Sequence, residues 1–263
     1  MSTDQISDNY AGPPRGLLNH LHFAWVILWA GLSSIPCAIA QIVGHLFDPT
    51  ARNFRRWGGA WAHITLKMSG YRVSVERSAN LDAHVPYVYV SNHQTGLDIW
   101  THLVGIPGPF GFVAKAELKR IPFIGIALRF SASLFVDRST PRKAVASMRE
   151  AAERIRNGNS VLIYPEGRRT WSPEVDPFLK GAFQLAVEAG VPIVPTALIN
   201  TYRLYDERFK SSKPGVVRLV IGSPIETEGL NRANIPELME RVKDFIESEI
   251  RASGMPPSDP AGR

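Results

Sequence analysis

The chain has 263 residues, of which 44% are hydrophobic and 21% are charged. This composition excludes a disordered protein and a polytopic membrane protein, and the length suits one sizeable α/β domain or two small ones. The formal net charge of +6 points to an anionic partner, which could be nucleic acid, a membrane surface or a phosphorylated substrate. The single cysteine, Cys37, excludes a disulfide framework and a cysteine-based zinc cluster.

The N-terminal part contains a long apolar run, because residues 16–47 include no Asp, Glu, Lys or Arg. Such a run indicates a membrane helix, so we expect residues 1–69 to form a membrane-attachment segment. Pro36 lies in the middle of the run and leaves two interpretations open. One is a single kinked membrane span, and the other is a helical hairpin that turns at residues 33–36 and enters one leaflet. A buried helix pair of a soluble core fits so long an uncharged run less well.

Basic residues follow this run. Arg52, Arg55 and Arg56 favour the cytoplasmic side of a membrane for the chain that comes next. Residues 55–67 interleave tryptophan with basic side chains, as an interfacial helix does. We therefore expect a protein attached to the lipid bilayer, at the cytoplasmic face of a bacterial inner membrane.

Beyond residue 70 the pattern alternates between short apolar runs and helical segments. The runs that predict strands are 86–91, 133–136, 160–164, 193–198 and 216–221, and the segments that predict helices are 140–157, 180–189 and 236–252. This alternation predicts an α/β fold over residues 70–252, with a mixed, largely parallel sheet flanked by helices. Residues 253–263, rich in proline and glycine, are expected to be a disordered tail.

The first candidate site is Asn92-His93-Gln94-Thr95-Gly96-Leu97-Asp98, directly after an expected strand. If a helix begins near Gly96, Asp98 falls in its first turn and faces back toward the loop. Its carboxylate can then hold one imidazole nitrogen of His93 and leave the other free to take a proton. A general base that acts on an alcohol requires this arrangement. A helix-capping role would also explain Asp98, so the spacing needs support from its context.

The second candidate site is Tyr164-Pro165-Glu166-Gly167-Arg168-Arg169-Thr170, again at the end of an expected strand. Arginine offers a planar set of donors suited to phosphate, and glycine permits close approach of the backbone. Two further blocks, KAEL at residues 115–118 and FVDR at residues 135–138, add cations near strand ends.

The blocks NHxxxxD, KxEL, FVDR, PEGxR and VPIVP, in this order, resemble the glycerolipid acyltransferase family, whose typical member is 1-acyl-sn-glycerol-3-phosphate acyltransferase. The resemblance covers roughly Val85 to Pro224. It implies transfer of a fatty acyl group from an acyl thioester, carried by acyl carrier protein or coenzyme A, to the free hydroxyl of a lysophospholipid. The favoured acceptor is 1-acyl-sn-glycerol-3-phosphate, which would give phosphatidic acid. The thioester is a co-substrate, and no cofactor is implied.

The resemblance also implies roles for single residues. His93 matches the general base and Asp98 the carboxylate that orients it. The residues implied in binding the phosphorylated acceptor are Lys115, Arg138, Glu166, Gly167 and Arg169. One position departs from the family pattern, because Arg168 stands where members usually carry threonine.

Several alternatives remain open at this stage. The acceptor could be another lysophospholipid or a lyso-aminolipid. A protein that binds the membrane surface without catalysis would explain the basic charge and the apolar run. A metal-dependent hydrolase is disfavoured, because no histidine pair near His93 completes a zinc site, and no metal is expected. Nucleic acid is not an expected partner, because the cations are dispersed along the chain.

Overall fold

The computed structural model describes residues 12–48, 51–82, 84–115, 133–136 and 140–254. Its centre is a seven-stranded sheet with the order β1-β9-β6-β2-β5-β3-β4. The strands of this sheet are β1 (Tyr71–Arg77), β2 (Val88–Ser91), β3 (Phe110–Lys115), β4 (Leu134–Val136), β5 (Ser160–Ile163), β6 (Ile193–Ile199) and β9 (Gly215–Ile221). A separate small hairpin pairs β7 (Tyr205–Asp206) with β8 (Ser211–Ser212).

Strands β2 to β6 run parallel to one another, β9 is antiparallel to β6, and β1 is parallel to β9. The predicted mixed, largely parallel sheet is therefore confirmed. Every residue of β2, β5 and β6 is buried. Strands covered on both faces need apolar residues at successive positions, and this explains the continuous apolar runs in the sequence.

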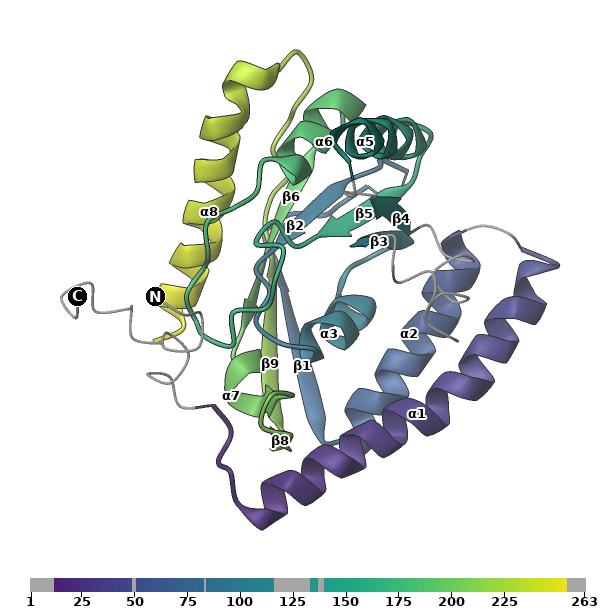
Figure 1. Cartoon of the computed structure of the whole chain (residues 1–263), viewed down its shortest axis with the longest axis vertical. Helices are drawn as coiled ribbons and strands as arrows, with labels where there is room; N and C mark the ends of the chain where they lie inside the picture. Colours follow the sequence, from purple (N-terminus) through teal and green to yellow (C-terminus); the bar gives the residue numbers. More distant parts are fainter. Residues whose placement is uncertain (1–11, 49–50, 83, 116–132, 137–139, 255–263) are drawn as a thin grey trace.

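Helices cover both faces of the sheet (Figure 1). The helices are α1 (Leu17–His45), α2 (Ala51–Met68), α3 (Leu97–Gly105), α5 (Pro141–Arg156), α6 (Gly181–Ala189), α7 (Thr201–Leu204) and α8 (Ile235–Ala252), with a 3₁₀ turn η3 (Arg232–Asn234) before α8. Apolar side chains of α5, α6 and α8 pack on one face, and those of α2 and α3, with Val26 of α1, pack on the other. Because the apolar cluster on the α3 face includes side chains of α1 and α2, these helices pack directly on the sheet domain.

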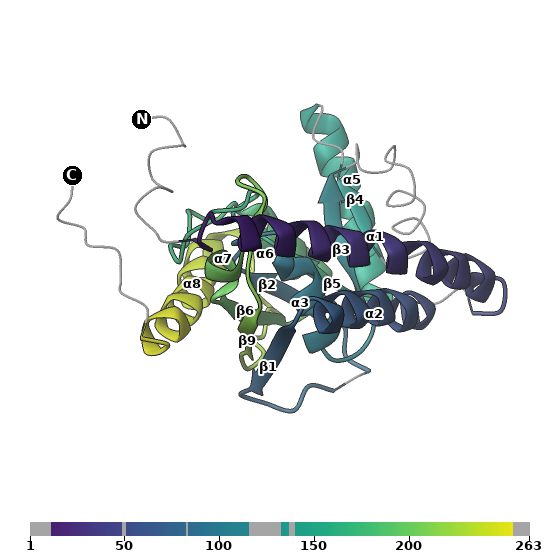
Figure 2. The ribbon, with the colours of Figure 1, turned by 90° about the horizontal axis from the view of Figure 1, so that it is seen from below.

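The apolar run forms one helix, α1, which continues through Pro36. The interpretation in which the chain turns at residues 33–36 is therefore wrong, and α2 returns along α1 only after residue 50 (Figures 1 and 2). Hydrogen bonds join the two helices along their length, since Trp61 Nε1 donates to the Ala30 carbonyl at 2.9 Å and Asn53 Nδ2 donates to the Gln41 carbonyl at 2.8 Å. By length and composition alone, α1 could cross a membrane.

Candidate active site

The predicted site residues that the structure describes come together at one edge of the sheet. Val90 of β2 and Ile163 of β5 are register partners, and His93 and Glu166 each follow three residues later. Lys115 ends β3, the next strand beyond β5. Because these strands are parallel, their carboxyl ends lie at the same edge, where open α/β sheets usually carry their sites.

His93 and Asp98 form the central pair of this edge. Their Nδ1 and Oδ2 atoms are 2.8 Å apart, and the side chain of Asp98 is fully buried while that of His93 is 13% exposed. A carboxylate can only accept a hydrogen bond, so Nδ1 is the donor, and in the neutral imidazole Nε2 then keeps its lone pair. The geometry predicted from the spacing is present: a fixed tautomer with one basic nitrogen.

The carboxylate of Asp98 is itself held in place. It lies in the first turn of α3, where the helix dipole favours a negative charge. Its Oδ2 atom also accepts backbone N–H bonds from Gln94 at 2.6 Å and Thr95 at 2.9 Å. The loop that carries His93 is therefore folded around the carboxylate that orients it.

An aromatic ring fixes the imidazole from its face. Tyr164 stacks on His93 with a centroid separation of 3.9 Å and an interplanar angle of 14°. The Tyr164 hydroxyl lies 3.0 Å from Nδ1 of His102, which also lies 2.9 Å from the backbone oxygen of Asp98. Burial lowers the pKa of His102 to about 4, so this second histidine is neutral at pH 7. Burial raises the pKa of Tyr164 well above its usual value.

Glu166 holds the His93 loop in place through hydrogen bonds to the backbone. Its two carboxyl oxygens accept the backbone N–H of His93 at 2.7 Å and of Asp176 at 3.2 Å. Burial raises the pKa of Glu166 to about 8, although these two N–H groups act in the opposite direction. In this structure Glu166 therefore binds the backbone of the loop that carries His93.

The two candidate loops are joined through their backbones. Thr170 N–H donates to the His93 carbonyl at 2.9 Å, and Trp171 N–H donates to the Gln94 carbonyl at 3.0 Å. Gly167 has a φ of 72°, a left-handed conformation that glycine adopts without strain. The PEGxR loop can therefore turn back and run beside His93.

The predicted cations have different partners. Arg169 Nη1 lies 2.7 Å from Glu207 Oε1, and Arg168 pairs with Asp176 at 2.6 Å. The Lys115 side chain lies outside what the structure describes, and Arg138 lies outside the described residues altogether.

Three residues of the site were missed by the sequence reasoning: His102, Tyr164 as a stacking partner, and Glu207. A signal existed for His102, which follows Asp98 by four residues on α3 and therefore shares its helix face. None existed for Glu207, which meets Arg169 across 38 positions of the chain.

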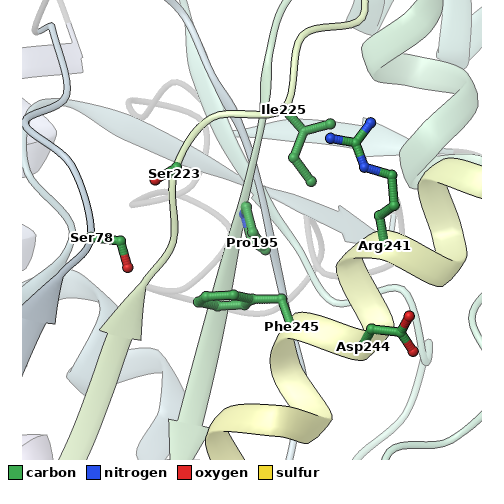
Figure 3. Close-up of a pocket in the computed structure, with 7 residues that line it drawn as sticks. All are labelled: Ser78, Pro195, Ser223, Ile225, Arg241, Asp244 and Phe245. Carbon is green, nitrogen blue, oxygen red and sulfur yellow. The ribbon is translucent and has the colours of Figure 1, made fainter.

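A pocket of about 430 Å³ lies elsewhere, between α8 and the sheet (Figure 3). It is lined by Ser78, Pro195, Ser223, Ile225, Arg241, Asp244 and Phe245. Ser78 and Ser223 follow the carboxyl ends of β1 and β9, which run opposite to β2. The pocket therefore belongs to the far end of the sheet and contains none of the predicted site residues.

The His93–Asp98 pair and the Arg169 loop lie together at the carboxyl edge of the α/β sheet, within residues 72–199. Residues 72–199 match the family described as Acyltransferase. The chain is 32% identical over 191 residues to mouse 1-acyl-sn-glycerol-3-phosphate acyltransferase alpha, over 71% of this chain and 67% of that protein. The chain belongs to the acyltransferase family, as its ordered blocks predicted.

Two further similarities concern a yeast protein and a bacterial structure. The chain is 33% identical to the 1-acyl-sn-glycerol-3-phosphate acyltransferase of Saccharomyces cerevisiae, over 74% of this chain but only 65% of that protein. The crystal structure of the 1-acyl-sn-glycerophosphate acyltransferase PlsC from Thermotoga maritima superposes with a TM-score of 0.78, covering 94% of this chain and all of that one at 24% identity. This last likeness confirms the fold.

Proposed function

We propose that this protein transfers a fatty acyl group from an acyl thioester to the free hydroxyl of a lysophospholipid, and that 1-acyl-sn-glycerol-3-phosphate is the acceptor. The product would be phosphatidic acid. The observation that carries the proposal is the His93–Asp98 pair, whose loop is hydrogen-bonded through its backbone to the residues that follow Arg169. The names of the mouse and yeast relatives support the acceptor.

In the proposed reaction, Nε2 of His93 takes the proton of the acceptor hydroxyl as its oxygen attacks the thioester carbonyl carbon. Asp98 stabilises the imidazolium that forms. The carbon–sulfur bond then breaks, and the thiol leaves with the proton from His93. The thioester is already activated, so this sequence needs no covalent enzyme intermediate. Coenzyme A or acyl carrier protein would carry the donor.

The acceptor phosphate is proposed to bind at Arg169, with Lys115 and Arg138 as further candidates. A guanidinium can donate two parallel hydrogen bonds to a phosphate, which adds geometric selectivity to charge attraction. Glu166 and Gly167 would shape this loop rather than touch the phosphate, given the backbone contacts of Glu166 and the left-handed turn at Gly167.

The N-terminal helices are proposed to attach the protein to a bilayer, on the cytoplasmic side. Large apolar side chains along one side of α1 are exposed: Leu17, Leu18, Leu21, Trp25, Leu28, Leu32, Ile35, Ile39 and Ile42. From Leu18 onward they recur every three or four residues and so form one stripe, while the other side packs on α2 and the sheet domain. A helix with this exposure fits one that lies in the membrane surface, with its stripe in the acyl chains.

The activity is tested by offering the purified protein a panel of lysolipids with both donors and identifying the products by mass spectrometry. The panel contains lysophosphatidic acid, phosphodiester lysolipids and a lyso-aminolipid. We expect phosphatidic acid to form fastest. If another lysolipid reacts faster, that lysolipid is the acceptor instead. If no acylated product forms, the proposed acyl transfer is wrong and only a membrane-binding role is left.

A further inference from the structure

One carboxylate of the chain occupies the site proposed for the acceptor phosphate. Glu207 Oε1 lies 2.7 Å from Nη1 of Arg169, and its Oε2 accepts the N–H of Gly96 at 3.5 Å. Gly96 is the N-cap of α3, the helix whose first turn carries Asp98. A guanidinium and a helix N-terminus, two donors that commonly bind phosphate, therefore converge on one internal anion.

The position of Glu207 is fixed by its surroundings. It lies in the turn between β7 and β8, next to Asp206, whose carboxylate pairs with Arg208 at 2.7 Å. The Arg208 guanidinium in turn lies 4.6 Å from the centre of the ring of Trp171, which follows the PEGxR loop. Hydrogen bonds from Asn19 to Ser212 and from Ser211 to Pro14 tie the hairpin to the start of α1 and the segment before it.

We propose that the Glu207 carboxylate is an internal competitor of the acceptor phosphate, which binds Arg169 only after displacing it. This inference rests on the proposed function, since it takes Arg169 as the phosphate ligand. Glu207 would thereby set the acceptor concentration at which the enzyme works, while touching neither the reacting hydroxyl nor the thioester. It is a specificity-determining residue for the acceptor.

The expected change in acceptor affinity follows from the solvent exposure of the Arg169–Glu207 pair. The Arg169 and Glu207 side chains are 37% and 21% exposed, and such partly exposed ion pairs are worth about 0.2–1 kcal/mol. Apparent affinity falls by the fraction of molecules whose site is free. Removing the Glu207 carboxylate should therefore tighten acceptor binding by roughly two- to sixfold, because the form in which Glu207 occupies Arg169 is then no longer populated.

The experiment compares Glu207→Gln, Arg169→Ala and the double variant in the full-length protein. Acceptor KM, donor KM and kcat are measured with lysophosphatidic acid in mixed micelles at fixed detergent. The inhibition constant of sn-glycerol 3-phosphate, a soluble phosphate monoester, is measured in the same variants, with glycerol as the uncharged control. Glu76→Gln is the matched variant, because Glu76 pairs with Arg218 at 2.8 Å on the outer strands.

For Glu207→Gln we expect acceptor KM and the glycerol phosphate inhibition constant to fall together by roughly two- to sixfold, with donor KM and kcat unchanged. Glu207→Ala should act in the same direction, and Glu76→Gln should have no effect. In the Arg169→Ala background the Glu207 substitution should do nothing, because the two act through one contact.

Two results would overturn parts of this scheme separately. If Arg169→Ala raises acceptor KM but Glu207→Gln raises it as well, Glu207 orients the arginine and does not compete with phosphate. If Arg169→Ala leaves acceptor KM unchanged, the phosphate does not bind Arg169, and the proposed acceptor site fails together with the inference. The proposed acyl transfer would then still be judged by the products of the lysolipid panel.

Discussion

At the scale of single residues, the proposed chemistry depends on one imidazole nitrogen, Nε2 of His93. We expect His93→Ala to lower kcat by about 10²- to 10⁴-fold, because a positioned general base contributes that much to proton transfer. Binding to vesicles should stay unchanged, since the apolar stripe of α1 is untouched. His84→Ala, at an exposed histidine outside the site, is the control. Near-normal turnover in His93→Ala would rule out the mechanism.

A second residue-scale effect concerns pH. The pKa of Glu166 is raised to about 8, so the folded state holds a proton that the unfolded state releases near pH 4.5. The folded state binds more protons than the unfolded state between these values, so stability falls as pH rises through this window. The pKa of His102 is lowered to about 4, so His102 makes stability rise with pH, but only below about pH 6.5.

We therefore expect a stability loss of about 1–2 kcal/mol between pH 6.5 and 8 that is absent in Glu166→Gln, whose side chain does not ionise. For a chain of this size the loss corresponds to a drop in Tm of roughly 3–6 °C. Tryptophan fluorescence melting of both proteins in detergent measures the difference. Parallel Tm curves would mean that Glu166 titrates normally.

The residues most accurately predicted from sequence were those joined by local geometry. His93 and Asp98 are five positions apart, so a strand, a loop and one helical turn were enough to bring them together. The contact of Gly96 with Glu207 spans 111 positions and depends on the placement of the β7–β8 hairpin. No local pattern encodes such a distance, and the competing carboxylate could be seen only in three dimensions.

At the scale of elements, α3 is fixed at both ends. Asp98 lies in its first turn, and its last residue, Gly105, packs closely on the sheet. A Cβ atom added at Gly105 would overlap the buried Leu219 side chain of β9 and lie 3.2 Å from a methyl of Val75 in β1. A close approach of this kind requires glycine.

We expect Gly105→Ala to destabilise the protein by about 1–3 kcal/mol, because the core around it is already filled. Since α3 would shift, kcat should fall as well, as displacements near 1 Å at a catalytic group are costly. Gly31→Ala is the matched control: nothing lies within 4 Å of its Cβ, and alanine favours a helix by about 0.5–1 kcal/mol. Equal Tm values for both variants would contradict the tight contact.

Prediction of elements succeeded where apolar residues follow one another along a strand or recur at helical spacing. Strands β2, β4, β5, β6 and β9 and helices α5, α6 and α8 were all expected, with ends shifted by a few residues. The sequence reasoning missed β1, whose inward residues alternate with polar ones because its other face is partly exposed. It also missed β3, and it allowed a turn at Pro36 that α1 does not make. Packing of α1 against α2 outweighs the local cost of proline.

At the scale of the whole molecule, the apolar stripe and the active site are linked. His22 of α1 contacts the Ser212 hydroxyl at 2.7 Å, and the same hairpin carries Glu207 to the site. The hairpin therefore joins the start of α1 to the Arg169 loop, where the acceptor phosphate is proposed to bind. We propose that the stripe, rather than the basic charge alone, holds the protein on a membrane.

We expect the double variant Leu28→Glu, Leu32→Glu to bind vesicles roughly 30-fold more weakly, because two half-exposed leucines leave the acyl region and charges enter it. Transfer to a short-chain soluble lysophosphatidate should be unchanged, since the site is intact. Val216→Glu, at a similarly exposed apolar residue of β9, should bind vesicles normally. Flotation on anionic and neutral vesicles distinguishes apolar insertion from charge attraction. If the double variant loses binding to both kinds of vesicle, the stripe holds the protein on the membrane. If it still binds anionic vesicles fully, the basic surface does.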